Sequence, residues 1–168
     1  PSLPTIDSKL LPSRALLDTG VILRAHDLGD PHATDPLSKL VWEGMLGNSA
    51  SILIAAPSLA EILRYRAGTP FPVVSGVEVV DFDDEAARII GEKMPMDVLI
   101  EVMKHGDRKS YLKFDTLILA CAVRHKAECV VALDKEHHRL APHAGIPVRT
   151  PPDFESKAPT QLFLKPIT

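Results

Sequence analysis

The chain has 168 residues, which fits a single domain large enough to bury a sizeable core. Its apolar share of 45% and charged share of 24% are those of an ordinary globular protein, and a formal net charge of −3 argues against a strongly basic coat for nucleic acid, although not against local basic patches. With no apolar run of about 18 residues and no basic-then-apolar leader, we expect a cytoplasmic protein that does not enter a membrane. The two cysteines lie in apolar segments and are predicted to be buried, reduced thiols.

Short apolar runs typical of strands in a parallel sheet recur along the chain. After a proline-bearing tail at residues 1–12, they are ALLD at residues 15–18, SILIA at 51–55, VEVVDF at 77–82, CVVAL at 129–133 and a last edge strand at 146–148. Residues 154–168 are interrupted by prolines and are predicted to be a second tail outside the core. Residues 13–153 are therefore predicted to form the domain.

Helical patterns separate these strands. Pro36 suits a first helical position, with Asp35 as its cap, and apolar residues then recur at helical spacing. Further helices are predicted at residues 57–66, 84–92, 97–104, 115–123 and 136–140. Because strands alternate with helices throughout, the sequence predicts an α/β fold with a mainly parallel sheet.

The segment KFDTLILACAVRHKAECVVALDKE, residues 113–136, is the centre of this pattern. Asp115 precedes TLILACAV, which is apolar on every side and is therefore predicted to be a buried helix that Asp115 opens. The strand CVVAL follows and leads directly to Asp134 and Glu136. Ligands of open α/β sheets bind at the carboxyl ends of the strands, so these acids are expected at a binding edge.

Four acidic residues fall on that edge. Asp18 ends the first strand, Glu61 lies early in the helix after the second strand, Asp115 opens the buried helix and Asp134 ends the fourth strand. Carboxylates gathered in one cleft repel one another unless a cation neutralises them. A set of oxygen ligands favours Mg²⁺ or Mn²⁺, ions that commonly activate water in phosphodiester cleavage.

Each acid taken alone has a structural explanation. Asp18 and Asp115 precede predicted helices and suit the role of a helix cap, and Asp134, directly before Lys135, suits an ordinary turn. A glutamate in the first turns of a helix, as at Glu61, is favoured by the helix dipole. A purely structural explanation nevertheless requires four coincidences at one edge of the sheet, which favours a site.

Four segments in this order resemble the PIN domain, with the VapC-type toxins of prokaryotic toxin–antitoxin pairs as the most similar group: ALLDTGVI, APSLAEILRYR, KFDTLILACAV and VVALDKEHHRLAPHAGIPV. The resemblance implies a three-layer α/β/α fold and a metal-dependent endoribonuclease that cleaves RNA, forms a homodimer and is inhibited by an antitoxin protein. By motif position, its catalytic and metal-binding acids are Asp18, Glu61, Asp115 and Asp134, with Glu136 as a further metal ligand. Ala132 stands where the family often has Ser or Thr, so a hydroxyl that could orient a ligand is absent.

Residues around the acids are candidates for substrate binding. Thr19 follows the first acid, and Arg108, Lys109 and Lys113 precede the third, where cations suit RNA phosphates. Adjacent histidines on a helix point in different directions, so His137-His138 is predicted to be solvated surface rather than part of a metal site.

Two other functions remain open at this point. A phosphatase-like α/β hydrolase also uses an acid at a strand end, but its Asp-x-Asp signature is missing because Gly20 lies two residues after Asp18. A catalytically silent PIN-like module that binds RNA or protein is the other alternative. The presence of all four acids argues against it, whereas Ala132 keeps it open.

Overall fold

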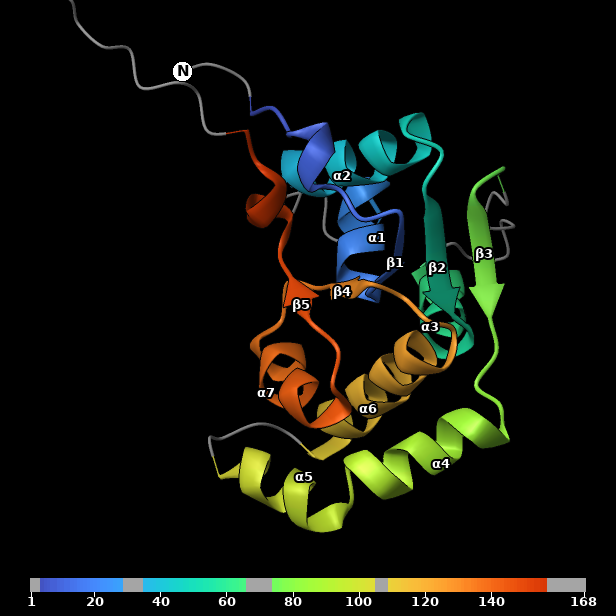
Figure 1. The fold of residues 1–168 in the computed structure, drawn as a ribbon, viewed down its shortest axis with the longest axis vertical. Coiled ribbons are helices and arrows are strands. Elements are labelled where there is room, and N and C mark those ends of the chain that lie inside the picture. The colour runs from blue at the N-terminus through green and yellow to red at the C-terminus, as the bar shows by residue number, and fades with distance from the viewer. Residues whose placement is uncertain (1–3, 29–34, 66–73, 105–108, 157–168) are drawn as a thin grey trace, which may run out of the picture.

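The computed structural model describes residues 4–28, 35–65, 74–104 and 109–156, and it confirms the predicted α/β class. A five-stranded sheet lies at the centre in the order β3-β2-β1-β4-β5, and each pair of neighbouring strands is parallel (Figure 1). The strands are β1 (Arg14–Leu17), β2 (Ser51–Ala55), β3 (Val77–Val80), β4 (Cys129–Val131) and β5 (Val148–Arg149). The helices are α1 (Thr19–Ala25), α2 (Pro36–Gly47), α3 (Ala56–Tyr65), α4 (Asp84–Lys93), α5 (Met96–Met103), α6 (Lys109–Arg124) and α7 (Lys135–Ala144), with short 3₁₀ helices η1 (Ser8–Leu10) and η2 (Pro151–Phe154).

Side chains alternate across the sheet and build two separate cores. Leu16 and Leu53 belong to a buried cluster with residues of α4, α5, α6 and α7. Ala15 and Ile52, one residue away on the same strands, belong to a second cluster with residues of α1, α2 and α3. A parallel sheet buried on both faces in this way explains why the strands read as continuous apolar runs. The molecule therefore has the three layers that the sequence predicted.

The ends of β1 and β4 lie side by side in the middle of the sheet. Leu17 pairs with Val131, and the next backbone amide, that of Asp18, donates a hydrogen bond of 2.9 Å to the Val131 carbonyl. The chain leaves β1 toward β2 but leaves β4 toward β5, on opposite sides of this pair. Such a topological switch point is where open α/β sheets form their ligand crevice.

Two helices extend beyond their predicted bounds. α6 begins at Lys109, so Asp115 lies in its second turn and does not open it, contrary to the prediction. α7 continues through Pro142 to Ala144, because its buried stripe of Leu140, Ala141 and Ala144 remains in contact with the core. It ends at Gly145, which adopts the left-handed conformation with φ 76° that glycine accommodates without strain.

Both cysteines are buried and free, as predicted. Burial raises the pKa of Cys121 to about 12 and that of Cys129 to about 11. Since a thiol binds metals as the thiolate, neither side chain is suited to serve as a ligand at neutral pH. Among the helices in the described part of the chain, none has the length and apolar character needed to cross a membrane.

The prediction that nothing after Asp153 contributes to the core is wrong. Phe154 is 0% exposed and packs in the cluster beneath α1 and α2. Its carbonyl accepts a hydrogen bond of 2.9 Å from the Asp7 amide, and Ile6 forms an antiparallel bridge with Glu155. A single aromatic residue among prolines gives no periodic signal, which is why the sequence did not reveal it. The domain boundaries at residues 13 and 153 stay a prediction.

Replacing Phe154 with alanine is expected to lower the free energy of unfolding by about 3–5 kcal/mol, the usual effect of emptying a buried aromatic site. The Arg149 guanidinium, 4.0 Å from the centre of the ring, would lose its contact as well. Urea unfolding measures the change. Glu155→Ala is the matched control, because Glu155 is exposed and its bridge to Ile6 is made by the backbone. A loss below about 1 kcal/mol for Phe154→Ala would mean that the C-terminal segment is dispensable.

Candidate metal centre

The four predicted acids line one cavity of about 390 Å³ at the carboxyl ends of the strands. Asp18 comes from the end of β1, Glu61 from α3, Asp115 from α6 and Asp134 from the connection between β4 and α7. The other residues that line it are Thr19, Gly20, Leu23, Arg64, Phe114 and Ile118. The sequence pattern thus placed the four acids together correctly, and their catalytic and metal-binding roles stay predictions.

Asp18 uses its two carboxylate oxygens for different purposes. Oδ2 accepts a hydrogen bond of 3.2 Å from the Gly20 amide and caps α1. Oδ1 faces the interior, 3.7 Å from Nε2 of His137, and the residue as a whole is only 4% exposed. The helix-cap explanation is therefore correct for one oxygen, while the other remains available to a ligand.

Asp134 and Glu136 flank the start of α7. Asp134 stands at the N-cap position of α7, and its side chain makes no capping hydrogen bond. Glu136 lies in the first turn and is not among the described residues that line the cavity, although its negative charge acts on Asp115. Ala132 is fully buried and offers no ligand atom.

Asp115 has the most perturbed carboxyl group of the site. Burial raises its pKa to about 7, since its side chain is 13% exposed. The charge of nearby His137 opposes this shift, whereas the negative charges of Asp18, Asp134 and Glu136 add to it. A carboxyl held this way keeps a proton near neutral pH unless a cation takes its place. Perturbed groups in a cleft are characteristic of functional sites.

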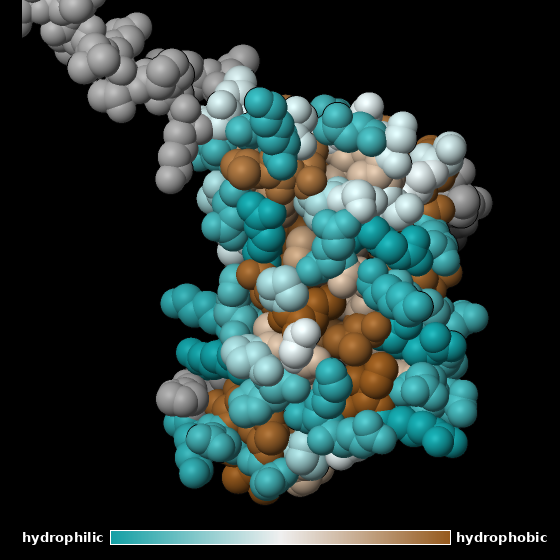
Figure 2. All heavy atoms as spheres, viewed as in Figure 1, coloured by the Kyte–Doolittle hydropathy of each residue, from teal (hydrophilic) through white to brown (hydrophobic). Residues whose placement is uncertain are grey.

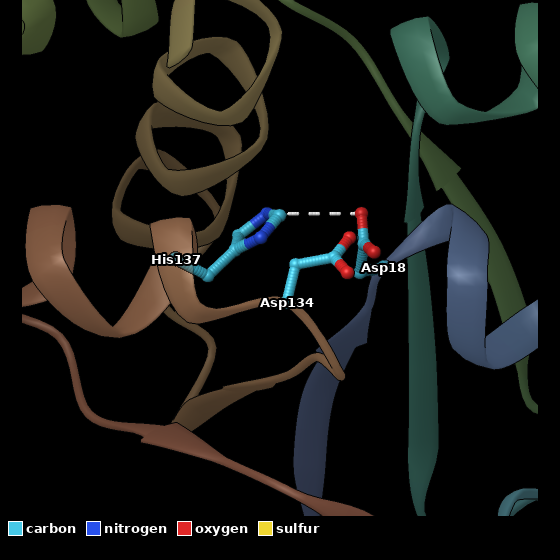
Figure 3. A group of neighbouring side chains, drawn as sticks. All are labelled: Asp18, Asp134 and His137. Atoms are coloured by element: carbon cyan, nitrogen blue, oxygen red, sulfur yellow. Dashed lines mark ion pairs between the residues drawn. The ribbon is translucent and has the colours of Figure 1, made fainter. Parts of the chain in front are cut away.

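His137 also belongs to the site, and the prediction that it is solvated surface is wrong. Its side chain is 1% exposed, with Nε2 3.7 Å from Oδ1 of Asp18 and 3.8 Å from Oδ1 of Asp115. Figure 3 shows its ring pointing from α7 toward the carboxylates of Asp18 and Asp134. The neighbouring His138 is exposed, as predicted.

The spacing of α7 contained the signal for His137. The helix buries His137, Leu140, Ala141 and Ala144, which recur at three- and four-residue intervals along one face. His137, the first residue of this face, also lies three residues after Asp134, which is about one helical turn. Read as part of this stripe, His137 is directed inward and toward the acids.

The side chains at this site fit a divalent cation. One ligand atom each from Asp18, Asp134 and His137 lies within 4.8 Å of the other two. Buried polar atoms without a hydrogen-bond partner among the described residues gather here as well, namely Oγ1 of Thr19 and both ring nitrogens of His137. Leaving such atoms unpaired costs free energy that a bound ion or ligand recovers. The donor set includes a nitrogen, which the sequence prediction of oxygen ligands alone had left out.

The predicted substrate-binding residues divide into three groups. Thr19 lines the cavity. Lys113 is exposed two residues before Asp115, and it lines a separate hollow between α4, α5 and α6. Lys109 begins α6, and Arg108 lies outside the described residues. Arg64, from α3, is an exposed cation on the rim of the acidic cavity.

Comparison with known proteins supports the fold of this site. No protein-family model and no curated protein matches the sequence. Among solved structures, the chain is similar to a chain of VapBC2 from Rickettsia felis bound to a DNA fragment from their promoter, with a TM-score of 0.54 and 17% identity over 81% of this chain and 97% of that one. It is also similar to a chain of FitAB bound to an IR36 DNA fragment, with a TM-score of 0.51 and 20% identity over 82% and 94% of the two chains.

At these identities the similarity concerns the arrangement of helices and strands rather than the site chemistry. The match extends over nearly the whole of both neighbours, so it describes a complete fold and not a shared fragment. It agrees with the five-stranded parallel sheet, with the helices on its two faces and with the fold that the four sequence segments predicted. The chain therefore has the PIN-domain fold.

Proposed function

We propose that this protein is a metal-dependent endoribonuclease and the toxin of a toxin–antitoxin pair. The observation that carries the proposal is the group of four acids, one of them with its pKa raised to about 7, in a cavity at the switch point of a PIN fold. The chains of similar structure come from VapBC2 and FitAB, whose VapC and FitB components are PIN-domain toxins. That similarity supports the toxin class and a cognate antitoxin as partner.

In this proposal Asp18, Glu61, Asp115 and Asp134 hold one or two Mg²⁺ or Mn²⁺ ions. When bound, such ions supply a nucleophile from water at neutral pH and stabilise the charge that develops on a phosphodiester. Asp115 gives up its proton when it becomes a ligand, and the cap bond from Gly20 fixes the orientation of the Asp18 carboxylate. This fixed placement supplies the positioning that the reaction needs.

Two residues at the cavity suit the phosphate of an RNA strand. The hydroxyl of Thr19 is buried and has no hydrogen-bond partner among the described residues, so it is free to donate to a phosphate oxygen. Arg64 provides a cation at the rim, and its planar fork pairs with phosphate through two hydrogen bonds. Phe114 lines the same cavity and offers an aromatic face on which a base can stack.

The proposal includes a homodimer and an antitoxin complex. Large hydrophobic side chains are exposed on α3, where Leu63 and Tyr65 are 40% and 54% exposed, and on α5, where Met96 and Ile100 are 54% and 50% exposed. Figure 2 shows hydrophobic side chains over α5 among mostly hydrophilic ones. Such surfaces suit a second copy of the chain or a partner. We propose that the antitoxin places an arginine among the carboxylates, since its fork matches paired acids.

The test is a cleavage assay with single-stranded RNA, single-stranded DNA and a small phosphate ester as parallel substrates. We expect cleavage of RNA with Mg²⁺ or Mn²⁺, none after chelation with EDTA, and recovery when the ion is restored. Cleavage of the small ester alone would favour a phosphatase-like hydrolase. Metal-independent binding of RNA without cleavage would show a silent module and overturn the proposal.

A further inference from the structure

His137 is buried beside the acids but, unlike an apolar core residue, it carries two polar ring nitrogens that need partners. Its side chain is 1% exposed, and neither ring nitrogen has a hydrogen-bond partner among the described residues. A neutral imidazole carries one N–H donor and one acceptor nitrogen, and leaving either unpaired in the interior is unfavourable. Retention of this arrangement in the folded protein is explained most simply by something that binds the ring.

The distances around Nε2 are too long for hydrogen bonds and suitable for a shared ion. A protonated imidazole that neutralised the acids would donate to them at about 2.7–2.9 Å. The separations are 3.7 Å to Asp18 Oδ1 and 3.8 Å to Asp115 Oδ1. With bonds of about 2.1 Å to a common ion, two ligand atoms lie between roughly 3.0 Å apart at a right angle and 4.2 Å apart at opposite positions. Both observed distances fall in that interval.

We propose that His137 is a nitrogen ligand of the metal centre and makes it selective for first-row transition ions over Mg²⁺. Mg²⁺ prefers oxygen ligands, whereas imidazole suits first-row transition ions, whose affinity for such ligands rises from Mn²⁺ through Co²⁺ to Cu²⁺ and then falls at Zn²⁺. Asp18 and Asp134 complete a donor set of two carboxylates and one imidazole within 4.8 Å. The inference rests on the metal-binding part of the proposed function and is independent of the RNA substrate.

The chain offers well-matched variants for a test. His137→Leu fills the buried space without a ligand atom, and His137→Gln replaces the nitrogen with an amide oxygen at a similar distance. His138→Leu is the control, because His138 is the next residue on α7 but is exposed. Isothermal titration calorimetry gives the affinity of each protein for Co²⁺ and for Mg²⁺, and the visible absorption of bound Co²⁺ reports its ligands. Thermal melts without metal confirm that each variant is folded.

We expect the wild type and His138→Leu to bind Co²⁺ at least about tenfold more tightly than His137→Leu does, since even a residue that only supports a ligand changes affinity by that factor. Affinity for Mg²⁺ should change much less, and His137→Gln should retain Mg²⁺ binding while losing the preference for Co²⁺. The Co²⁺ absorption spectrum should change in both His137 variants and not in the control.

Three results would contradict the inference in distinguishable ways. Equal Co²⁺ to Mg²⁺ affinity ratios in the wild type and both His137 variants would show that the ring is not a ligand, while the proposed metal-dependent function would stand. Binding of neither ion by the wild type would overturn the inference together with the metal part of that function. If the His137 variants fail to fold, nitrogen NMR of the wild type decides: the imidazole signal of His137 shifts on addition of Zn²⁺, and an unchanged signal refutes the assignment.

Discussion

Replacing Asp115 with asparagine is expected to reduce metal-dependent RNA cleavage by roughly 10³-fold or more while leaving the fold intact. The side chain keeps its size and polarity but loses the negative charge that the bound ion needs. A loss of that size corresponds to about 4 kcal/mol of transition-state stabilisation, which is within the range that a metal ion supplies. Asp115 lies in the second turn of α6 and has no capping role, so the substitution removes no helix cap.

The measurement is single-turnover cleavage of RNA at saturating Mn²⁺, with circular dichroism as the check of folding. Asp97→Asn is the matched control, since Asp97 is an exposed acid in the first turn of α5 and is not among the described residues that line the cavity. It should cleave like the wild type. Robust cleavage by Asp115→Asn that still depends on metal would remove Asp115 from the proposed machinery.

The sequence predicted that the four acids lie together because the rule behind that prediction is geometric. Side chains that follow parallel strands meet at one edge of the sheet, whatever the details of packing. Asp18 and Asp134 illustrate this rule: they are 116 positions apart, and the pairing of Leu17 with Val131 brings them to one cavity. Apolar runs bounded by acids therefore carried enough information to place these carboxylates in one cavity.

What the sequence did not predict depends on which way a side chain faces. His137 was assigned to the surface because two histidines in a row cannot both point inward, but that argument does not say which one does. The structure decides through the buried stripe at Leu140, Ala141 and Ala144, whose phase places His137 inside and His138 outside. The burial of Phe154 was equally hard to predict, because the segment around it has no hydrophobic periodicity.

The raised pKa of Asp115 is a further property that the sequence did not predict, because it depends on energetics rather than on which way a side chain faces. Its place at the head of an apolar run suggested a helix start, and the helix in fact begins six residues earlier. The consequence for chemistry is large, because an acid inside a helix and packed against the core is desolvated more strongly than one at an open end. Its pKa of about 7 follows from that burial and from three neighbouring acids, a sum that requires coordinates.

The metal-free Asp115→Asn protein is expected to be more stable than the wild type at pH 8, by about 1–3 kcal/mol. The pKa of the Asp115 carboxyl is about 7 in the folded protein, whereas an aspartate in the unfolded chain has the ordinary value of 3.8. Between these two pH values, the folded protein therefore binds one more proton at this carboxyl than the unfolded chain does. The stability that this proton contributes is fully present below about pH 4 and is lost as the pH rises through 7. A shift of this size has an upper limit of roughly 4 kcal/mol, which screening and relaxation reduce. Asparagine does not ionise, so the variant does not lose this stability as the pH rises.

Thermal melts from pH 4 to pH 8, with and without Mn²⁺, test this account. Without metal, the two proteins should melt at similar temperatures near pH 4, and the variant should melt higher by roughly 2–12 °C at pH 8, since 1 kcal/mol shifts the midpoint of a chain of this length by about 2–4 °C. Mn²⁺ at pH 8 should then raise the midpoint of the wild type by preferential binding to the folded state, and should do much less for the variant, which lacks a ligand. A structural acid behaves in the opposite way, because its replacement removes a needed interaction and leaves the metal response unchanged. An apo variant that melts lower at pH 8, with a Mn²⁺ shift equal to that of the wild type, would therefore show that Asp115 supports the architecture and that the metal lies elsewhere.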